Sequence, residues 1–260
     1  MKIDRILGII IYLLNHDKVS AKTLAEKYNV SVRTVQRDMV NIASSGIGKA
    51  IAEMLVSLGY EVFGFGREFT AEVSFHPVVC DLLDTEELER HIKQIRKQYE
   101  IYILINNAGI GYYGLHEELN AAKIKQMVRT NLELPLLLSN LLLRDLKKSK
   151  GYLLQISSVT ALKNSPHGCA YGATKAGLTA FSRSLFDEAR KYGVKVTVIH
   201  PDMTQTKLYR NADFTAAEDL QASLLPEDVA EAVRTVLAAR DGMVIPELTV
   251  CPQLHRISKK

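Results

Sequence analysis

A phenol, an ammonium group and a hydroxyl are spaced along this chain in a way that could support proton transfer. Tyr171 and Lys175 are four residues apart in a predicted helix, so their side chains lie on the same face. An ammonium group stabilises a neighbouring phenolate, so Lys175 is expected to lower the pKa of Tyr171 from its ordinary value of about 10. Ser158 ends a predicted strand, Asn106–Gly109 ends another, and Asn131 lies on a helix between them.

The elements that must position these groups alternate regularly beyond residue 43. Short apolar runs predict strands, and amphipathic segments predict helices. The strands are expected at Glu61–Phe65, His76–Cys80, Ile101–Ile105, Tyr152–Ser157, Val194–His200 and, as the last, near Leu248–Cys251; the helices are expected at Lys49–Leu58, Thr85–Gln98, Asn120–Leu146 with a perturbation near Pro135, Tyr171–Tyr192 and Pro226–Ala238. This alternation predicts an α/β fold, a doubly wound, Rossmann-like parallel sheet with helices on both faces.

Length and charge point to a large domain with a small basic appendage. The 260 residues are 47% apolar, which suffices for one large α/β domain and an additional small segment. The net charge is only +4, and residues 1–42 carry +3 of it. An anionic partner is therefore expected for that first segment alone.

The cysteines and apolar runs indicate a cytoplasmic protein. Cys80, Cys169 and Cys251 are far apart and no pair has metal-ligand spacing, so reduced thiols and no metal site are expected. The apolar run Ile6–Leu14 is about half the length that spans a bilayer, and no small-residue cleavage site follows it. We therefore predict neither a membrane segment nor a signal peptide.

Residues 1–42 predict three short helices, at Lys2–Asn15, Ala21–Tyr28 and from Val32 toward Asn41. The segment resembles the helix-turn-helix of bacterial transcription regulators, with residues 20–38 carrying the likeness. In such motifs the third helix enters the major groove, which makes Arg33, Thr34 and Arg37 candidates for DNA contacts. Weak DNA binding through residues 20–37 and a solvated helical hairpin without a DNA role both remain open, since no β-wing follows the third helix.

From Ala43 to the C-terminus the chain resembles the short-chain dehydrogenase/reductase family. The likeness rests on an ordered set of motifs rather than on any one of them, namely Ser44–Gly48, Asp81, Asn106–Gly109, Asn131, Ser158, Tyr171 with Lys175, and Pro201 with Thr206. The resemblance implies an oxidoreductase that interconverts a small carbonyl and an alcohol by hydride transfer, and also a homodimer or homotetramer.

The resemblance assigns four catalytic residues. Tyr171 would be the general acid or base, Lys175 would assist it and bind the nicotinamide ribose, Ser158 would polarise the carbonyl, and Asn131 would anchor a water connected to Lys175. The cofactor contacts that it implies are Ser44, Ser45, Gly46, Ile47, Gly48, Arg67, Asp81, Leu82, Asn107, Ala108, Gly109, Tyr171, Lys175, Pro201 and Thr206. The substrate side is expected near Tyr112, Tyr113, His167, Cys169 and Met203–Leu225.

The residue pair Gly66-Arg67 predicts the choice of cofactor. An acidic residue at the end of this strand would bind the adenosine 2′-hydroxyl of NAD. Gly66 stands there instead, and the guanidinium of Arg67 suits a 2′-phosphate, which predicts NADP.

One stretch departs from the family pattern. Asn41 and Ile42 stand where the family has Thr-Gly, and β-branched Ile42 tolerates a positive φ poorly. The family's first, central strand is also not encoded as such, so we expect Met39–Ile42 to supply it. This divides the chain into a helix-turn-helix-like segment, 1–37, and an oxidoreductase domain, 38–260.

These patterns lead to one principal hypothesis and two alternatives. The principal hypothesis is an NADP(H)-dependent short-chain oxidoreductase whose activity is reduced by the altered glycine motif. The alternatives are a redox-sensing, DNA-binding transcription regulator and a fusion product without selected activity.

Overall fold

The computed structural model describes residues 46–69, 73–217, 219, 221–254 and 256–259. Three predictions concern residues outside these ranges: the helix-turn-helix-like segment 1–37, the strand Met39–Ile42, and the cofactor contacts of Ser44 and Ser45. The predicted domain boundary at residue 38 also lies there.

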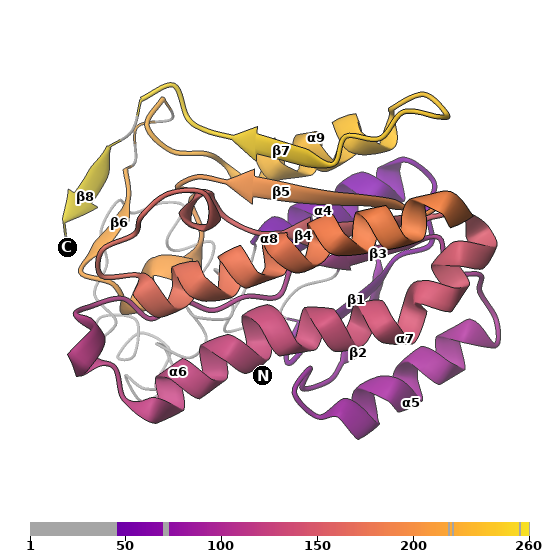
Figure 1. Ribbon diagram of the computed structural model, residues 1–260, viewed down its shortest axis with the longest axis horizontal. Helices are drawn as coiled ribbons and strands as arrows, with labels where there is room; N and C mark the ends of the chain where they lie inside the picture. The colour runs from indigo at the N-terminus through magenta and orange to yellow at the C-terminus, as the bar shows by residue number, and fades with distance from the viewer. Residues whose placement is uncertain (1–45, 70–72, 218, 220, 255, 260) are drawn as a thin grey trace, which may run out of the picture.

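A four-stranded parallel sheet forms the centre of the described fold (Figure 1). Its strands are ordered β3 (Ile103–Asn106), β4 (Tyr152–Ile156), β5 (Lys195–Pro201) and β7 (Glu247–Val250). Every residue of β4 is buried, as expected for a strand that is covered on both faces. Since all four strands are parallel, their carboxyl ends lie along one edge of the sheet, and the residues that follow them are gathered there.

A second parallel sheet contains only β1 (Phe63–Gly66) and β2 (His76–Val79). Among the described residues no hydrogen bond joins β1 to β3. Residues of β1 and β3 instead line one cavity of about 660 Å³. The predicted strand Met39–Ile42 would lie between them, and it remains a prediction.

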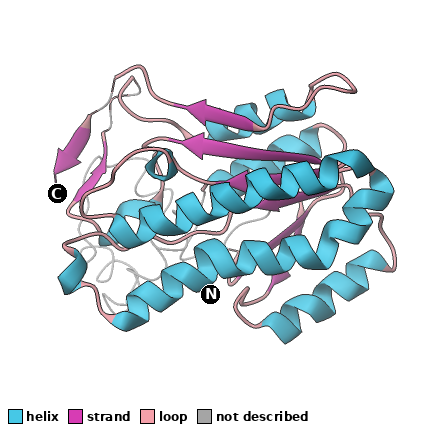
Figure 2. Cartoon of the chain, viewed as in Figure 1, coloured by secondary structure: helices cyan, strands magenta, loops and turns pink. Residues whose placement is uncertain are grey.

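Helices cover both faces of the sheet (Figure 2). On one face, α4 (Ile47–Ser57) packs against α9 (Pro226–Leu237), and apolar side chains of both helices contact β4 and β5. On the other face lie α5 (Thr85–Arg96), α7 (Leu134–Ser149) and α8 (Cys169–Ala189), whose apolar faces bury two further clusters. The predicted doubly wound, Rossmann-like architecture is confirmed.

The long helix predicted from Asn120 is interrupted. The Asn120 side chain accepts a hydrogen bond from the backbone N–H of Lys123 and caps α6 (Ala121–Val128). A wide π-helical turn, η2 (Arg129–Glu133), then connects α6 to α7. Pro135 lacks an N–H group and its ring conflicts with the carbonyl one turn earlier, which accounts for the predicted perturbation. This turn places the buried side chain of Asn131.

The remaining short helices are η1 (His116–Glu118), η3 (Val159–Ala161), η4 (Arg190–Tyr192) and η5 (Lys207–Asn211). One expectation was wrong: the strand near residue 250 is not the last. An antiparallel pair, β6 (Phe214–Ala216) with β8 (Ile257–Lys259), ties the C-terminal segment to the chain beyond β5. Within the described ranges no helix combines the length and apolar character needed to cross a membrane.

Candidate active site

The carboxyl ends of β3, β4 and β5 bring the predicted catalytic residues together with the first turn of α8. Tyr171 and Lys175 are one helical turn apart and are only 3% exposed. Ser158 follows β4 and is also buried. Tyr171 and Ser158 are joined by a side-chain hydrogen bond.

Burial controls the acidity of Tyr171. It raises the pKa of the Tyr171 phenol to about 12, while the hydrogen bond from Ser158 acts in the opposite direction. The sequence expectation that Lys175 lowers this pKa is wrong for the described structure. The Lys175 Nζ atom lies 5.8 Å from the centre of the Tyr171 ring and donates a hydrogen bond elsewhere.

Lys175 is held inside the protein by one strong contact of its side chain. Its Nζ atom donates to the carbonyl of Ile156, at 2.8 Å. Burial disfavours the charged ammonium and lowers the pKa of Lys175 to about 8. The amine can therefore gain or lose a proton close to neutral pH.

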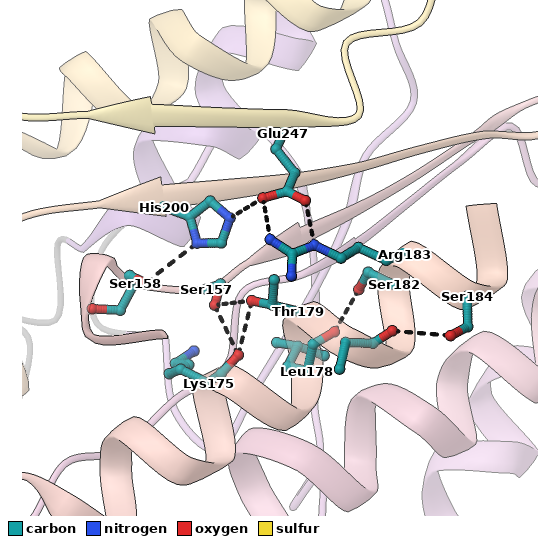
Figure 3. Close-up of polar contacts among 11 residues, drawn as sticks. Ser157, Ser158, Lys175, Leu178, Thr179, Ser182, Arg183, Ser184, His200 and Glu247 are labelled. Atoms are coloured by element: carbon teal, nitrogen blue, oxygen red, sulfur yellow. Dashed lines mark hydrogen bonds and ion pairs between the residues drawn. The ribbon is translucent and has the colours of Figure 1, made fainter. Parts of the chain in front are cut away.

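Hydroxyl groups fix the backbone from which Lys175 projects. The carbonyl of Lys175 accepts hydrogen bonds from Thr179 Oγ1 (2.9 Å) and from Ser157 Oγ (3.2 Å), as Figure 3 shows. The two hydroxyl oxygens are themselves 3.0 Å apart. Because Ser157 immediately precedes Ser158, this network ties α8 to the end of β4.

Asn131 bonds to the Ile110 backbone and to Thr174 rather than to Tyr171. Its Oδ1 atom accepts a hydrogen bond from the N–H of Ile110 (2.9 Å), and its Nδ2 atom donates to the carbonyl of Ile110 (2.8 Å) and to Thr174 Oγ1 (3.2 Å). A Cβ atom added at Gly109 would lie 3.6 Å from Lys175 Nζ and 3.7 Å from Asn131 Oδ1. Gly109 therefore lies beside both predicted catalytic groups.

The first turn of α4 faces the cavity. Gly46, Ile47 and Gly48 line it, together with Gly66, Leu82, Asn107 and Ala108 from the ends of the first three described strands. No described side chain caps this helix, so its first N–H groups can bind an anion. A Cβ atom at Gly48 would lie 2.5 Å from Asn107 Nδ2, so glycine permits this close approach. The uncapped start of α4 and the close approach at Gly48 fit the pyrophosphate of a dinucleotide, at the end of the cavity beside Asn107.

The remaining predicted cofactor contacts occupy neighbouring positions. Arg67 is exposed at the end of β1. Asp81 follows β2, and its Oδ1 atom accepts a hydrogen bond from the backbone N–H of Leu83. Pro201 ends β5, and Thr206 caps η5 by accepting from the N–H of Leu208, at 3.3 Å.

Asp202 fixes the turn that follows Pro201 with backbone and side-chain contacts. The Asp202 backbone N–H donates to the carbonyl of Val250, and its side chain accepts from the N–H of Met203 (2.8 Å). The carboxylate also pairs with Lys163 at 3.6 Å.

An aromatic cluster adjoins the Tyr171 ring. The Tyr113 ring centre is 5.6 Å from that of Tyr171, 5.9 Å from that of Tyr209 and 5.2 Å from that of Phe214. Of the predicted substrate side, Tyr113 and the segment after Met203 therefore adjoin Tyr171. Tyr112 instead bonds to Gln126, and His167 and Cys169 are exposed.

Sequence patterns did not indicate a polar group behind Ser158. His200 on β5 is fully buried, and it contacts both the Ser158 carbonyl and Glu247, which in turn binds Arg183 (Figure 3). A histidine inside a predicted apolar strand was the available signal, because such a residue needs buried polar partners.

Two families match this chain. The short chain dehydrogenase family matches residues 39–216, and an HTH domain matches residues 5–57. A 3-oxoacyl-(acyl-carrier-protein) reductase from Salmonella typhimurium is 30% identical over 199 residues, which cover 73% of this chain and 80% of that protein. An uncharacterized oxidoreductase from Staphylococcus saprophyticus is 29% identical over 82% of this chain and 96% of its own length.

Solved structures of dehydrogenases have the same fold as the described residues. An alcohol dehydrogenase from the archaeon Thermococcus sibiricus, complexed with 5-hydroxy-NADP, superposes with a TM-score of 0.71 at 26% identity and covers 82% of this chain and 95% of its own. An aldohexose dehydrogenase from Thermoplasma acidophilum gives a TM-score of 0.72 at 25% identity, covering 82% of this chain and 91% of its own.

Proposed function

The chain belongs to the short chain dehydrogenase family, and we propose that it is an NADP(H)-dependent oxidoreductase that interconverts a small carbonyl and an alcohol. The observation that carries this proposal is the convergence of Tyr171, Ser158 and Lys175 beside the same edge of the sheet as the uncapped first turn of α4.

Tyr171 is the proposed general acid in carbonyl reduction and the general base in alcohol oxidation. Its phenol is buried and already bonded to Ser158, so both hydroxyls can address one substrate oxygen. The pKa of Lys175, lowered to about 8, suits it to exchange the proton that Tyr171 transfers. Asn131 fixes the Ile110 backbone beside them, and a role in anchoring a water for Lys175 is part of the proposal.

The cofactor supplies the hydride when it is bound. The N–H groups of Ile47 and Gly48 are proposed to face its pyrophosphate, and Asp81 and Leu82 its adenine. Asn107, Ala108 and Gly109 would contact the adenosine ribose, Tyr171 and Lys175 the nicotinamide ribose, and Pro201 and Thr206 the carboxamide. Ser44 and Ser45, outside the described residues, complete the proposed set.

The choice of NADP over NAD rests on the end of β1. Gly66 lines the cavity and Arg67 follows it with an exposed guanidinium, where no carboxylate from residue 66 can bind a 2′-hydroxyl. Similar solved structures support the same choice, since the Thermococcus sibiricus alcohol dehydrogenase is complexed with 5-hydroxy-NADP and a metagenomic short-chain oxidoreductase is in complex with NADP.

Ketone reduction tests the proposed activity. Full-length protein would be mixed with NADPH and a panel of small ketones and 3-oxoacyl thioesters, the latter because of the similar Salmonella reductase. Loss of NADPH absorbance that depends on Tyr171 would support the proposal. Absence of turnover with every carbonyl, in a protein that binds NADPH, would contradict it.

The HTH match gives a second candidate function, a redox-sensing regulator in which bound cofactor changes DNA affinity. The matched range extends through α4. However, α4 packs beside α9 in the oxidoreductase core, and its buried face is therefore not available to contact DNA. A gel shift on duplex DNA with and without NADPH separates the candidates, because coupled binding must be reciprocal. If neither DNA nor NADPH binds, the remaining reading is a fusion product without selected activity.

Assembly and location are proposed from the same features. The family resemblance suggests a homodimer or homotetramer that uses the helices within Asn120–Leu146 and Tyr171–Tyr192, and Leu137 on α7 is an exposed apolar residue there. The cysteines Cys80, Cys169 and Cys251 are free, which suits the reducing cytoplasm.

A further inference from the structure

His200 has hydrogen-bond acceptors at both of its ring nitrogens. Its Nδ1 atom lies 3.3 Å from the carbonyl oxygen of Ser158, and its Nε2 atom lies 3.3 Å from Glu247 Oε2. A carbonyl oxygen can only accept a hydrogen bond, and an ionised carboxylate likewise only accepts. A neutral imidazole carries one N–H and would leave its other nitrogen lone pair facing an oxygen lone pair.

Glu247 is held in its ionised form by a second partner. Arg183 on α8 approaches both carboxylate oxygens, with Nη2 at 3.0 Å from Oε2 and Nε in contact with Oε1. Arg183 lowers the pKa of Glu247 most strongly, and His200 lowers it further. A bidentate guanidinium keeps the carboxylate deprotonated, so Glu247 cannot supply the proton that would relieve the contact with His200.

The ring itself is sealed from water. His200 has 0% exposed surface, in contrast to Arg183, whose side chain is 57% exposed. A buried ring nitrogen cannot turn to solvent for a partner, so its protons must match the two acceptors. Only the imidazolium form satisfies both.

We propose that His200 is a positioning residue that acts as an imidazolium, donating from Nδ1 to the Ser158 carbonyl and from Nε2 to Glu247. Ser158 is thereby held from behind the active site while its hydroxyl faces Tyr171. The Ser158 carbonyl also accepts from the N–H of Ala161 at 3.0 Å, which starts η3, and His200 supplies its second hydrogen bond.

The charged groups near this cluster come from several elements. Glu247 lies on β7, Arg183 and Lys175 lie on α8, and the Lys163–Asp202 pair lies beyond the ends of β4 and β5. Glu247 is the carboxylate placed at hydrogen-bond distance from the ring, and it provides the counter-charge. The cluster links the outer strand of the sheet to the catalytic serine.

The protonation state can be measured directly. Full-length protein labelled with ¹⁵N at histidine would be studied by long-range ¹H–¹⁵N correlation at pH 7, with a His200→Asn variant identifying the His200 signals. The proposal requires directly protonated shifts at both ring nitrogens. In Glu247→Gln it requires a single proton, on Nδ1, since the counter-charge is gone. One bare nitrogen in the wild-type ring would overturn it.

The positioning role has a separate test, which rests on the proposed function. The amide nitrogen of asparagine can take the place of Nδ1, whereas that of glutamine reaches the place of Nε2. In His200→Gln the kcat for ketone reduction should therefore fall about tenfold with little change in KM. His200→Asn should keep most of the wild-type kcat.

Equal losses in two variants with unchanged melting temperatures would overturn the positioning role. If the wild-type protein reduces no ketone, the proposed function fails instead, and the NMR measurement still decides the protonation state of His200.

Discussion

The two halves of the described α/β fold, the four-stranded sheet with α8 and the β1–β2 sheet with α4, are built in different ways. Around β4, β5 and α8, the proposed catalytic side chains lie in a network of buried hydrogen bonds, such as those of Lys175 to Ile156 and of Ser157 to the Lys175 carbonyl. Around α4, residues of β1 and β3 instead line a cavity of about 660 Å³, and no described strand joins β1 to β3. The proposed catalytic residues thus contact one another within the described residues, whereas β1 and β3 are separated by the cavity.

Loss of the Tyr171 hydroxyl should have the largest effect of the substitutions, and that effect should be confined to the catalytic half. Tyr171→Phe removes the proposed proton donor, so kcat for ketone reduction should fall by about 10² to 10⁴-fold. NADPH affinity, measured by fluorescence titration, should stay within a few-fold of wild type. A variant that keeps its activity would show that another group transfers the proton.

Lys175 should show a stability change with pH. Its pKa in the folded protein is about 8, below the ordinary value of 10.5, so between these values only the unfolded chain binds the proton. Stability should therefore rise as the pH increases from about 8 to 10.5, by on the order of 2 kcal/mol from this group.

Lys175→Met is the matched control for this rise. Urea unfolding of both proteins at pH 7.5, 9 and 10 should show the wild type gaining stability relative to the variant. Parallel curves would show that Lys175 is not buried in its neutral form.

Gly48 tests the nucleotide half. In Gly48→Ala the new methyl group would meet Asn107 Nδ2, so either the Asn107 side chain or the first turn of α4 must move. NADPH affinity should fall about tenfold, equivalent to roughly 1.4 kcal/mol, with kcat at saturating cofactor nearly unchanged. Because Asn107 is itself a proposed cofactor contact, Asn107→Ala is the reference for a double variant: Gly48→Ala should lower NADPH affinity less in the Asn107→Ala background than in the wild type. An equal loss in both backgrounds would show that the conflict with the Asn107 amide is not the cause.

Ile42 should have the smallest effect of these substitutions. Ile42→Gly introduces the residue type that the predicted phosphate-facing turn favours, so NADPH should bind a few-fold more tightly. Leu58→Gly, at the other end of α4, serves as a control for general loosening. An unchanged affinity in Ile42→Gly would mean that this position matters less than the sequence suggests.

The two halves also differ in how far the sequence predicted them. The order and spacing of Asn131, Ser158, Tyr171 and Lys175 predicted residues that the structure brings to one edge of the sheet, and Pro135 correctly indicated the break between α6 and α7. Spacing along a helix did not reveal burial, so the direction of the Tyr171 pKa shift was wrong.

Contacts between distant residues were missed for a related reason. His200 and Glu247 are 47 residues apart, and β6 and β8 are three residues each, too short to give a periodic signal. Pairings of this kind depend on tertiary packing, which a single sequence does not display. The same limit applies to the strand predicted at Met39–Ile42, which stays a prediction.

The most direct test of the central claim is a titration of the full-length protein with NADPH and, separately, with NADH, following quenching of protein tyrosine fluorescence. Saturable binding that is at least about tenfold tighter for NADPH, and whose preference is lost in Arg67→Glu, is the result that this account predicts. Failure of both cofactors to bind would contradict it.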